Sequence, residues 1–179
     1  MLQRLGIPGM ARRTACLAVA LLAAACGHAS SSDSSAPQTA RVGAPAPGWS
    51  EPSLPGPTLS LHSLRGKAIY LNFFATWCPP CNEEAPTIDR LQQRFRAKGL
   101  QVVGVDVLEN ARKAEGFLEQ HHLSYPAIVD DGTLRNQYNV NGLPVHVFID
   151  RRGIIRRIDV GELSAGEMRQ AIVKLLHDS

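Results

Sequence analysis

Two cysteines separated by two residues, in the run Trp77-Cys78-Pro79-Pro80-Cys81, constrain the fold of this chain more than any other feature. The apolar residues 68–75 before the run predict a buried strand, and the apolar spacing of residues 82–98 after it predicts a helix. The pair therefore lies where a strand turns into a helix. Because the amides of a helix N-terminus stabilise a thiolate, we expect Cys78 to be the nucleophile. Cys81, one turn further on, is expected to be the buried resolving thiol of a reversible Cys78–Cys81 disulfide.

Other uses of a CxxC pair fit this sequence less well. A zinc site needs two more ligands, and the remaining cysteines, Cys16 and Cys26, lie in an N-terminal segment outside the expected domain. Covalent haem attachment needs a histidine directly after the second cysteine, where this chain has Asn82. A single peroxidatic cysteine is disfavoured, since Ala75 stands three residues before Cys78 where we would expect Thr. A purely structural disulfide across so short a loop would remove little chain entropy.

The first 25 residues have the composition of an export signal. Three arginines and no acid precede the apolar residues 15–25, a stretch too short to span a bilayer stably. We predict a signal peptide over residues 1–25, starting at Met1 or Met10. Small residues before Cys26 resemble a bacterial lipoprotein cleavage site, which predicts lipidation of Cys26. Ordinary cleavage after Ala25 is the alternative.

Residues 26–47 are predicted to form a flexible tether. They are rich in Ser, Ala, Pro and Gly and show no apolar periodicity, so they cannot bury enough surface to offset the entropy of ordering. A domain carried on such a tether, with a lipid at Cys26, would sit on the periplasmic or other extracytoplasmic face of a bacterial membrane.

Charge and length indicate one domain over residues 48–179. The chain has 19 Lys and Arg against 16 Asp and Glu, and the three arginines of the signal segment account for the whole excess. The mature chain is therefore neutral, and we expect no nucleic-acid partner and a monomer. A domain of about 130 residues is large enough for one hydrophobic core.

Strand and helix patterns alternate through this domain. After residues 82–98 we predict, in order, a strand (101–107), a helix (111–122), a strand (126–129), a short helix (134–138), a hairpin (145–150 with 154–160) and a helix capped by Ser164 that runs to residue 176. This order predicts an α/β domain with a central mixed sheet and helices on both faces.

The motifs resemble one family of thioredoxin-fold proteins. They are Asn72-Phe73-Phe74-Ala75-Thr76-Trp77-Cys78-Pro79-Pro80-Cys81, Glu84-Ala85-Pro86, Val103-Gly104-Val105, Tyr125-Pro126, Gly142-Leu143-Pro144 and Phe148-Ile149-Asp150. Over residues 42–179 the chain resembles the TlpA/ResA/DsbE-like thiol-disulfide oxidoreductases. Residues 111–129 look like the helix-and-strand insertion that separates this family from plain thioredoxin.

The resemblance implies roles for several residues. Pro144 aligns with the family's cis-proline beside the cysteines, and Leu143 before it departs from the polar or β-branched residue common there. Trp77, Pro80, Leu143 and Pro144 are the expected substrate-binding residues. Glu84 matches the family's acid three positions after the second cysteine, and this i to i+3 spacing places it on the helix face of Cys81. We expect Glu84 to move protons for Cys81.

The resulting functional expectation is thiol-disulfide exchange on exported proteins that carry cysteine pairs, without a cofactor. A membrane electron donor would keep the pair reduced, and the resemblance implies substrates such as cytochrome c haem-site or copper-chaperone cysteines. Two alternatives stay open. One is a disulfide-introducing oxidase of the same fold. The other is a copper-delivery module built from Cys78, Cys81 and His146, although a single strand histidine is more often a core residue.

Overall fold

The computed structural model describes residues 39–177. The predicted signal peptide (1–25), the lipidation site Cys26 and most of the predicted tether lie outside the described residues. Within residues 39–177, no helix combines the length and the apolar character that crossing a membrane requires.

A six-stranded mixed sheet forms the centre of the domain, in the strand order β2-β6-β5-β4-β7-β8. Strands β4, β5 and β6 are parallel, and β2, β7 and β8 run antiparallel to their neighbours. A separate two-stranded ribbon pairs β1 with β3. The elements in chain order are β1 (Ser50–Glu51), β2 (Ser53–Leu54), β3 (Leu59–Ser60), η1 (His62–Leu64), β4 (Ala68–Phe74), α1 (Pro79–Phe95), η2 (Arg96–Lys98), β5 (Leu100–Val107), α2 (Ala111–Gln120), β6 (Ala127–Asp130), α3 (Thr133–Gln137), β7 (Val145–Ile149), β8 (Ile155–Val160) and α4 (Ala165–His177).

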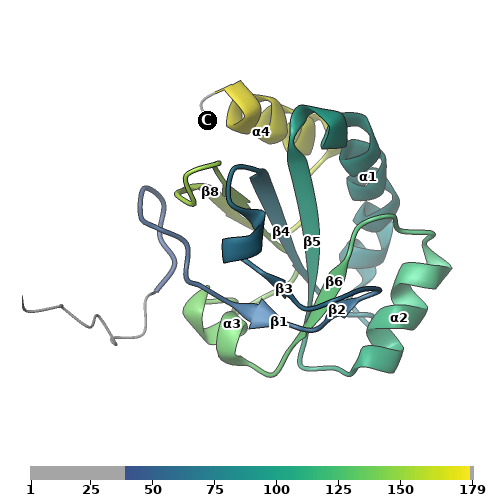
Figure 1. Ribbon diagram of the computed structural model, residues 1–179. Coiled ribbons are helices and arrows are strands. Elements are labelled where there is room, and N and C mark those ends of the chain that lie inside the picture. The colour runs from purple at the N-terminus through teal and green to yellow at the C-terminus, as the bar shows by residue number, and fades with distance from the viewer. Residues whose placement is uncertain (1–38, 178–179) are drawn as a thin grey trace, which may run out of the picture. The chain divides into compact units, whose positions relative to one another are not determined.

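Helices cover both faces of this sheet, as the sequence predicts (Figure 1). Alternate side chains of β4 point to opposite faces: Tyr70 packs with α1 and α4, and Leu71 packs with α3 and the segment that precedes β4. Helix α2 lies on the α1 face, where Phe117 stacks on Phe74 with ring centroids 4.5 Å apart. All seven residues of β4 are buried, which explains its continuous apolar sequence.

The predicted insertion is present as α2 and β6. Strand β6 extends the sheet beyond β5 and pairs with the edge strand β2, which the sequence analysis did not predict. A strand of two residues is too short to show the alternation of apolar and polar residues from which strands are predicted. The predicted cap of the last helix is confirmed, because Ser164 Oγ accepts from the N–H of Glu167 at 3.3 Å and the N–H of Ser164 donates to the Glu167 carboxylate at 2.9 Å.

Helix α1 starts earlier than predicted, and residues 39–47 make backbone contacts with the domain. Helix α1 begins at Pro79 instead of residue 82, because a proline is well accommodated in the first turn of a helix and Cys78 serves as its N-cap. Residues 39–47, placed at the end of the tether, have fixed contacts. The N–H groups of Ala40, Gly43 and Ala46 donate to backbone carbonyls of Gln137, Ile155 and Gly153. These backbone bonds do not depend on side-chain type, so composition could not predict them.

Gly104 occupies the middle of β5, where a side chain has no room. A Cβ at this position would lie 3.0 Å from Phe74 Cε1 and 3.3 Å from Ala127 Cβ. We expect Gly104→Ala to lower the free energy of unfolding by about 1–3 kcal/mol through overpacking. The matched control is Gly116→Ala, on the exposed face of α2 with nothing within 4 Å, which should raise it by about 0.5–1 kcal/mol. Urea unfolding of both variants tests this, and equal effects would contradict it.

Candidate active site

Three segments meet at one edge of the sheet. Strands β4 and β5 are parallel, so the loops that follow them leave the sheet at the same edge. Strand β7 is antiparallel to β4 and begins there, with Val145 opposite Phe73. The topology therefore brings the turn after β4, the loop after β5 and the segment before β7 together. The carboxyl edge of an α/β sheet is the usual location of a functional site.

The two cysteines are joined in a disulfide at the start of α1. Cys78 is the N-cap, and the N–H of Cys81 donates to its Sγ at 3.4 Å. One amide of the helix N-terminus therefore faces the Cys78 sulfur. Both cysteines are only 3% exposed, packed in an apolar cluster with Phe74, Ala75, Ala85, Phe117, Leu118 and Ala127. Trp77, directly before the pair, is 69% exposed.

The segment before β7 packs against this cluster. The Leu143–Pro144 peptide bond is cis, as the resemblance implied, and Leu143 packs on the apolar cluster that contains Cys78 and Cys81. Trp77 and Leu143 line a cavity of about 220 Å³. Its other lining residues are Val107, Leu108, Arg135, Val140, Asn141 and Gly142. Trp77 and Leu108 are both largely exposed, so this cavity has an apolar rim next to the turn that carries Cys78. Pro80 is half-buried in the first turn of α1.

Side chains from two other segments fix the turn that carries the cysteines. Asn82 Nδ2 donates to the carbonyls of Thr76 and Cys78 at 3.0 and 2.8 Å, and its Oδ1 accepts from His121 Nε2 at 3.0 Å. Glu109, in the loop after β5, accepts from the N–H and hydroxyl of Thr76 at 2.6 and 2.9 Å. Burial alone would raise the pKa of Glu109, but its hydrogen bonds outweigh burial and hold this pKa below the ordinary value.

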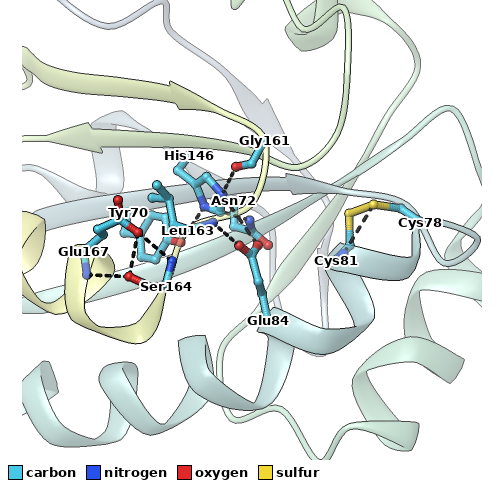
Figure 2. A network of polar contacts seen from close by, with 10 residues as sticks. All are labelled: Tyr70, Asn72, Cys78, Cys81, Glu84, His146, Gly161, Leu163, Ser164 and Glu167. Carbon is cyan, nitrogen blue, oxygen red and sulfur yellow. Dashed lines mark hydrogen bonds and ion pairs between the residues drawn. A yellow bond between two sulfur atoms is a disulfide. The ribbon is translucent and has the colours of Figure 1, made fainter.

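Glu84 is buried one turn beyond Cys81, on the helix face that points to the sheet (Figure 2). Its Oε1 accepts a short hydrogen bond from the N–H of Leu163, and its Oε2 accepts none. Burial raises the pKa of Glu84 to about 7, against the lowering effect of the Leu163 N–H. A carboxyl group that titrates near neutral pH can both take and release a proton.

His146 lies against Glu84, with Nε2 3.5 Å from Glu84 Oε2 (Figure 2). The Tyr70 hydroxyl is 2.7 Å from its Nδ1, Asn72 Nδ2 is 3.4 Å from the same nitrogen, and Nε2 is 3.1 Å from the carbonyl oxygen of Gly161. Both ring nitrogens therefore have polar partners, and neither offers a free lone pair to copper. Among the described residues, no three His, Cys, Asp or Glu side chains are grouped to hold a metal ion.

Asp106, another buried carboxyl group, lies near the end of β5 opposite Phe74. Its side chain is fully buried, and the Glu109 carboxylate is the hydrogen-bond partner available to the protonated form of Asp106. Burial, together with the charge of Glu109, raises the pKa of Asp106 to about 8. Asp106 is therefore protonated in the folded protein at neutral pH.

Sequence reasoning missed Tyr70, Asp106, Glu109 and the structural use of Asn82. The sequence did contain a signal for Tyr70, because a tyrosine inside a buried strand needs a hydrogen-bond partner for its hydroxyl. The sequence contained no signal for Glu109, because its partner Thr76 lies 33 residues away in the chain and no local pattern connects the two. Asn82 was considered only as the residue that excludes haem attachment.

Comparison with known proteins agrees with this geometry. Residues 42–158 match the AhpC/TSA family. The chain is 30% identical over 136 residues to the thiol-disulfide oxidoreductase ResA of Bacillus cereus, covering 75% of this chain and 79% of ResA. It is 36% identical over 134 residues to the thioredoxin-like protein YneN of Bacillus subtilis (strain 168), covering 73% of this chain and 78% of YneN.

Solved structures show the same fold. A thiol:disulfide interchange protein of the thioredoxin family from Chlorobium tepidum TLS has a TM-score of 0.70 at 31% identity, covering 76% of this chain and 98% of that one. A secreted Mycobacterium tuberculosis disulfide oxidoreductase homologous to Escherichia coli DsbE has a TM-score of 0.65 at 25% identity, covering 71% and 96%. The chain belongs to the AhpC/TSA family and is a thioredoxin-fold thiol-disulfide oxidoreductase of the ResA/DsbE type.

Proposed function

We propose that this protein is a reductase of disulfides in exported proteins. The observation that carries the proposal is the surroundings of the Cys78–Cys81 pair, which is packed among apolar side chains with the buried carboxyl group of Glu84 one turn away. An apolar environment and a nearby negative charge both disfavour thiolates. They therefore favour the disulfide over the dithiol and lower the reduction potential of the pair. The one hydrogen bond from the Cys81 N–H to Cys78 Sγ favours the thiolate and so acts to raise this potential.

Cys78 is the nucleophile in this proposal. Its thiolate attacks a substrate disulfide, which forms a mixed disulfide and releases one substrate sulfur as a thiolate. Cys81 then attacks Cys78 Sγ, which breaks the bond to the second substrate sulfur and closes the Cys78–Cys81 disulfide. A membrane protein that donates electrons to thioredoxin-like proteins returns two electrons.

Glu84 supports the second attack by accepting the proton of Cys81. Its Oε2 is the free acceptor, because it holds no hydrogen bond. With a pKa of about 7, the carboxyl group is partly ionised at neutral pH and can receive the thiol proton as Cys81 attacks. When the donor reduces the disulfide, the proton returns to Cys81.

The substrate is a protein segment with a cysteine pair. Because the sulfurs expose so little surface, a substrate must also contact the side chains around them, Trp77, Leu143, Pro144 and Pro80. The apolar surface of Trp77 and Leu108 favours an extended segment with an apolar residue near the reacting cysteine. Cytochrome c haem-site segments and copper-chaperone cysteines are the classes proposed.

The proposed location is the extracytoplasmic side of a bacterial membrane, with the protein as a monomer. The support is the arginine-bearing apolar segment 1–25 and the cysteine at position 26, which we propose is lipidated after signal cleavage. The related M. tuberculosis protein is described as secreted, which agrees with this location.

Equilibration of the purified chain with a thiol redox buffer tests the direction of the reaction. We expect the reduction potential of the Cys78–Cys81 couple to lie well below about −200 mV, as for a protein kept reduced by a dedicated donor. A value near about −120 mV would instead identify the oxidase alternative. The Cys78→Ser/Cys81→Ser double variant, measured in parallel, removes any contribution of other cysteines to the signal.

A further inference from the structure

The buried contacts of His146 define which of its nitrogens carries the hydrogen. Nε2 is 3.1 Å from the Gly161 carbonyl oxygen, which can only accept, so Nε2 must be the donor. Nδ1 then has a lone pair, and it accepts from the Tyr70 hydroxyl at 2.7 Å. Asn72 Nδ2 points to the same nitrogen at 3.4 Å. His146 is therefore a neutral imidazole in the Nε2–H form, and burial, which lowers its pKa to about 4, agrees with this assignment.

The Nε2–H group also faces the proposed proton acceptor. Glu84 Oε2 lies 3.5 Å from His146 Nε2 and holds no hydrogen bond. Because the single Nε2 hydrogen is donated to Gly161, His146 acts on this oxygen through the dipole of its N–H group. Register explains the approach: His146 pairs with Asn72 across β7 and β4, which puts both residues with Tyr70 on the sheet face that α1 covers. Figure 2 shows the Glu84 side chain leaving α1 toward this group, away from the disulfide.

We propose that His146, held as its Nε2–H tautomer by the Tyr70 hydroxyl, is a positioning residue that stabilises the ionised carboxylate of Glu84 and so sets the pH range in which Cys81 can attack. This inference rests on the proposed function of Glu84. In the step concerned, the proton of Cys81 moves to Glu84 and Cys81 Sγ bonds to Cys78 Sγ. The substrate sulfur leaves as a thiolate with the electron pair of the broken bond. His146 stays neutral and exchanges no proton.

Several other charged or titratable groups face this cluster. They are Asp89 on α1, Tyr125 before β6, Arg157 and Asp159 on β8, and Glu162 before α4. The negative charge of Glu162 raises the pKa of Glu84 and so disfavours its ionised form. The N–H group of His146 acts in the opposite direction, because it favours the carboxylate.

The test follows the resolving step directly. The reduced full chain is mixed with dithiobis(nitrobenzoate) in a stopped-flow instrument between about pH 5 and pH 9. Attack by Cys78 releases the first thionitrobenzoate, and attack by Cys81 on the mixed disulfide releases the second, so the second phase reports the step that Glu84 assists. His146→Leu should raise the pH midpoint of this phase by about one unit, since the N–H dipole that faces the ionised carboxylate is lost.

Two further variants separate donor chemistry from packing. Tyr70→Phe keeps the ring that stacks on Phe148 at 4.6 Å but removes the hydroxyl, and it should shift the midpoint in the same direction by less. His146→Gln retains a neutral N–H donor near the Nε2 position and should restore the wild-type midpoint. If His146→Leu does not fold, Tyr70→Phe decides the outcome.

The Glu84→Gln background distinguishes the two proposals. In that background the titration should disappear, and His146→Leu or Tyr70→Phe should cause no further shift. If Glu84→Gln leaves the profile unchanged, the role of Glu84 fails. If Glu84→Gln removes the titration while His146→Leu and Tyr70→Phe leave the wild-type midpoint in place, the positioning role of His146 is overturned and Glu84 keeps its role. If a titration and its shifts persist without Glu84, both proposals fail.

Discussion

Cys81→Ser should accumulate a stable mixed disulfide between Cys78 and its substrate, and Cys78→Ser should lower the rate of disulfide reduction by about 10³-fold or more. Without the sulfur of Cys81, nothing in the site can break the bond between Cys78 and the substrate. Without Cys78, the amide of Cys81 no longer has a sulfur to stabilise, and the nucleophile itself is gone. Non-reducing electrophoresis of the exported fraction shows the adducts.

The assignment of Cys78 as the nucleophile and Cys81 as the resolving thiol depends on adducts that form in Cys81→Ser but not in Cys78→Ser. Cys78→Ser should give no adducts, and the Cys78→Ser/Cys81→Ser double variant sets the background. Adducts of equal intensity and identity in both single variants would show that either sulfur can attack. The assignment of Cys78 as the nucleophile would then be wrong.

Asp106→Asn should stabilise the protein increasingly as the pH rises. Because the pKa of Asp106 is raised to about 8 in the folded protein, the folded state holds a proton that the unfolded chain releases near pH 4. The contribution of Asp106 is therefore fully present below about pH 4 and is lost as the pH rises toward 8. In this window the slope is about 1.4 kcal/mol per pH unit. The unfolding free energies of variant and wild type should diverge by about 3 kcal/mol between pH 5 and 7.

Asp150→Asn is the matched control, because Asp150 is also buried but is fully hydrogen-bonded. Its carboxylate accepts from the N–H groups of Arg152 and Ile154 and from the Arg156 guanidinium. These bonds outweigh burial and hold the pKa of Asp150 below its ordinary value. Asp150→Asn should therefore destabilise the protein by about 1–3 kcal/mol at every pH above 5. Urea unfolding at several pH values tests both variants, and parallel curves for Asp106→Asn and wild type would contradict the raised pKa.

The sequence determined the features that depend on near neighbours in the chain. A buried strand followed by Cys78 and a helix is readable from apolar spacing, and the capping pair Ser164 and Glu167 needs only an i to i+3 relation. The cysteine motif together with the five shorter motifs was sufficient to identify the family, and hence the cis peptide bond and the inserted helix and strand. The placement of Glu84 beside the turn of Cys81 also follows from helical periodicity.

Only the tertiary structure decided which distant residues contact the site and which buried carboxyl groups hold a proton. The Tyr70 hydroxyl meets His146 across 76 residues of chain, because β4 and β7 pair in one particular register. The same register brings His146 to Glu84, whereas the copper-module alternative had placed it beside the cysteines. The raised pKa values of Glu84 and Asp106 depend on how much water the surrounding helices exclude. Local patterns carry no information on register or on burial by distant elements, so these properties appear only when the chain has folded.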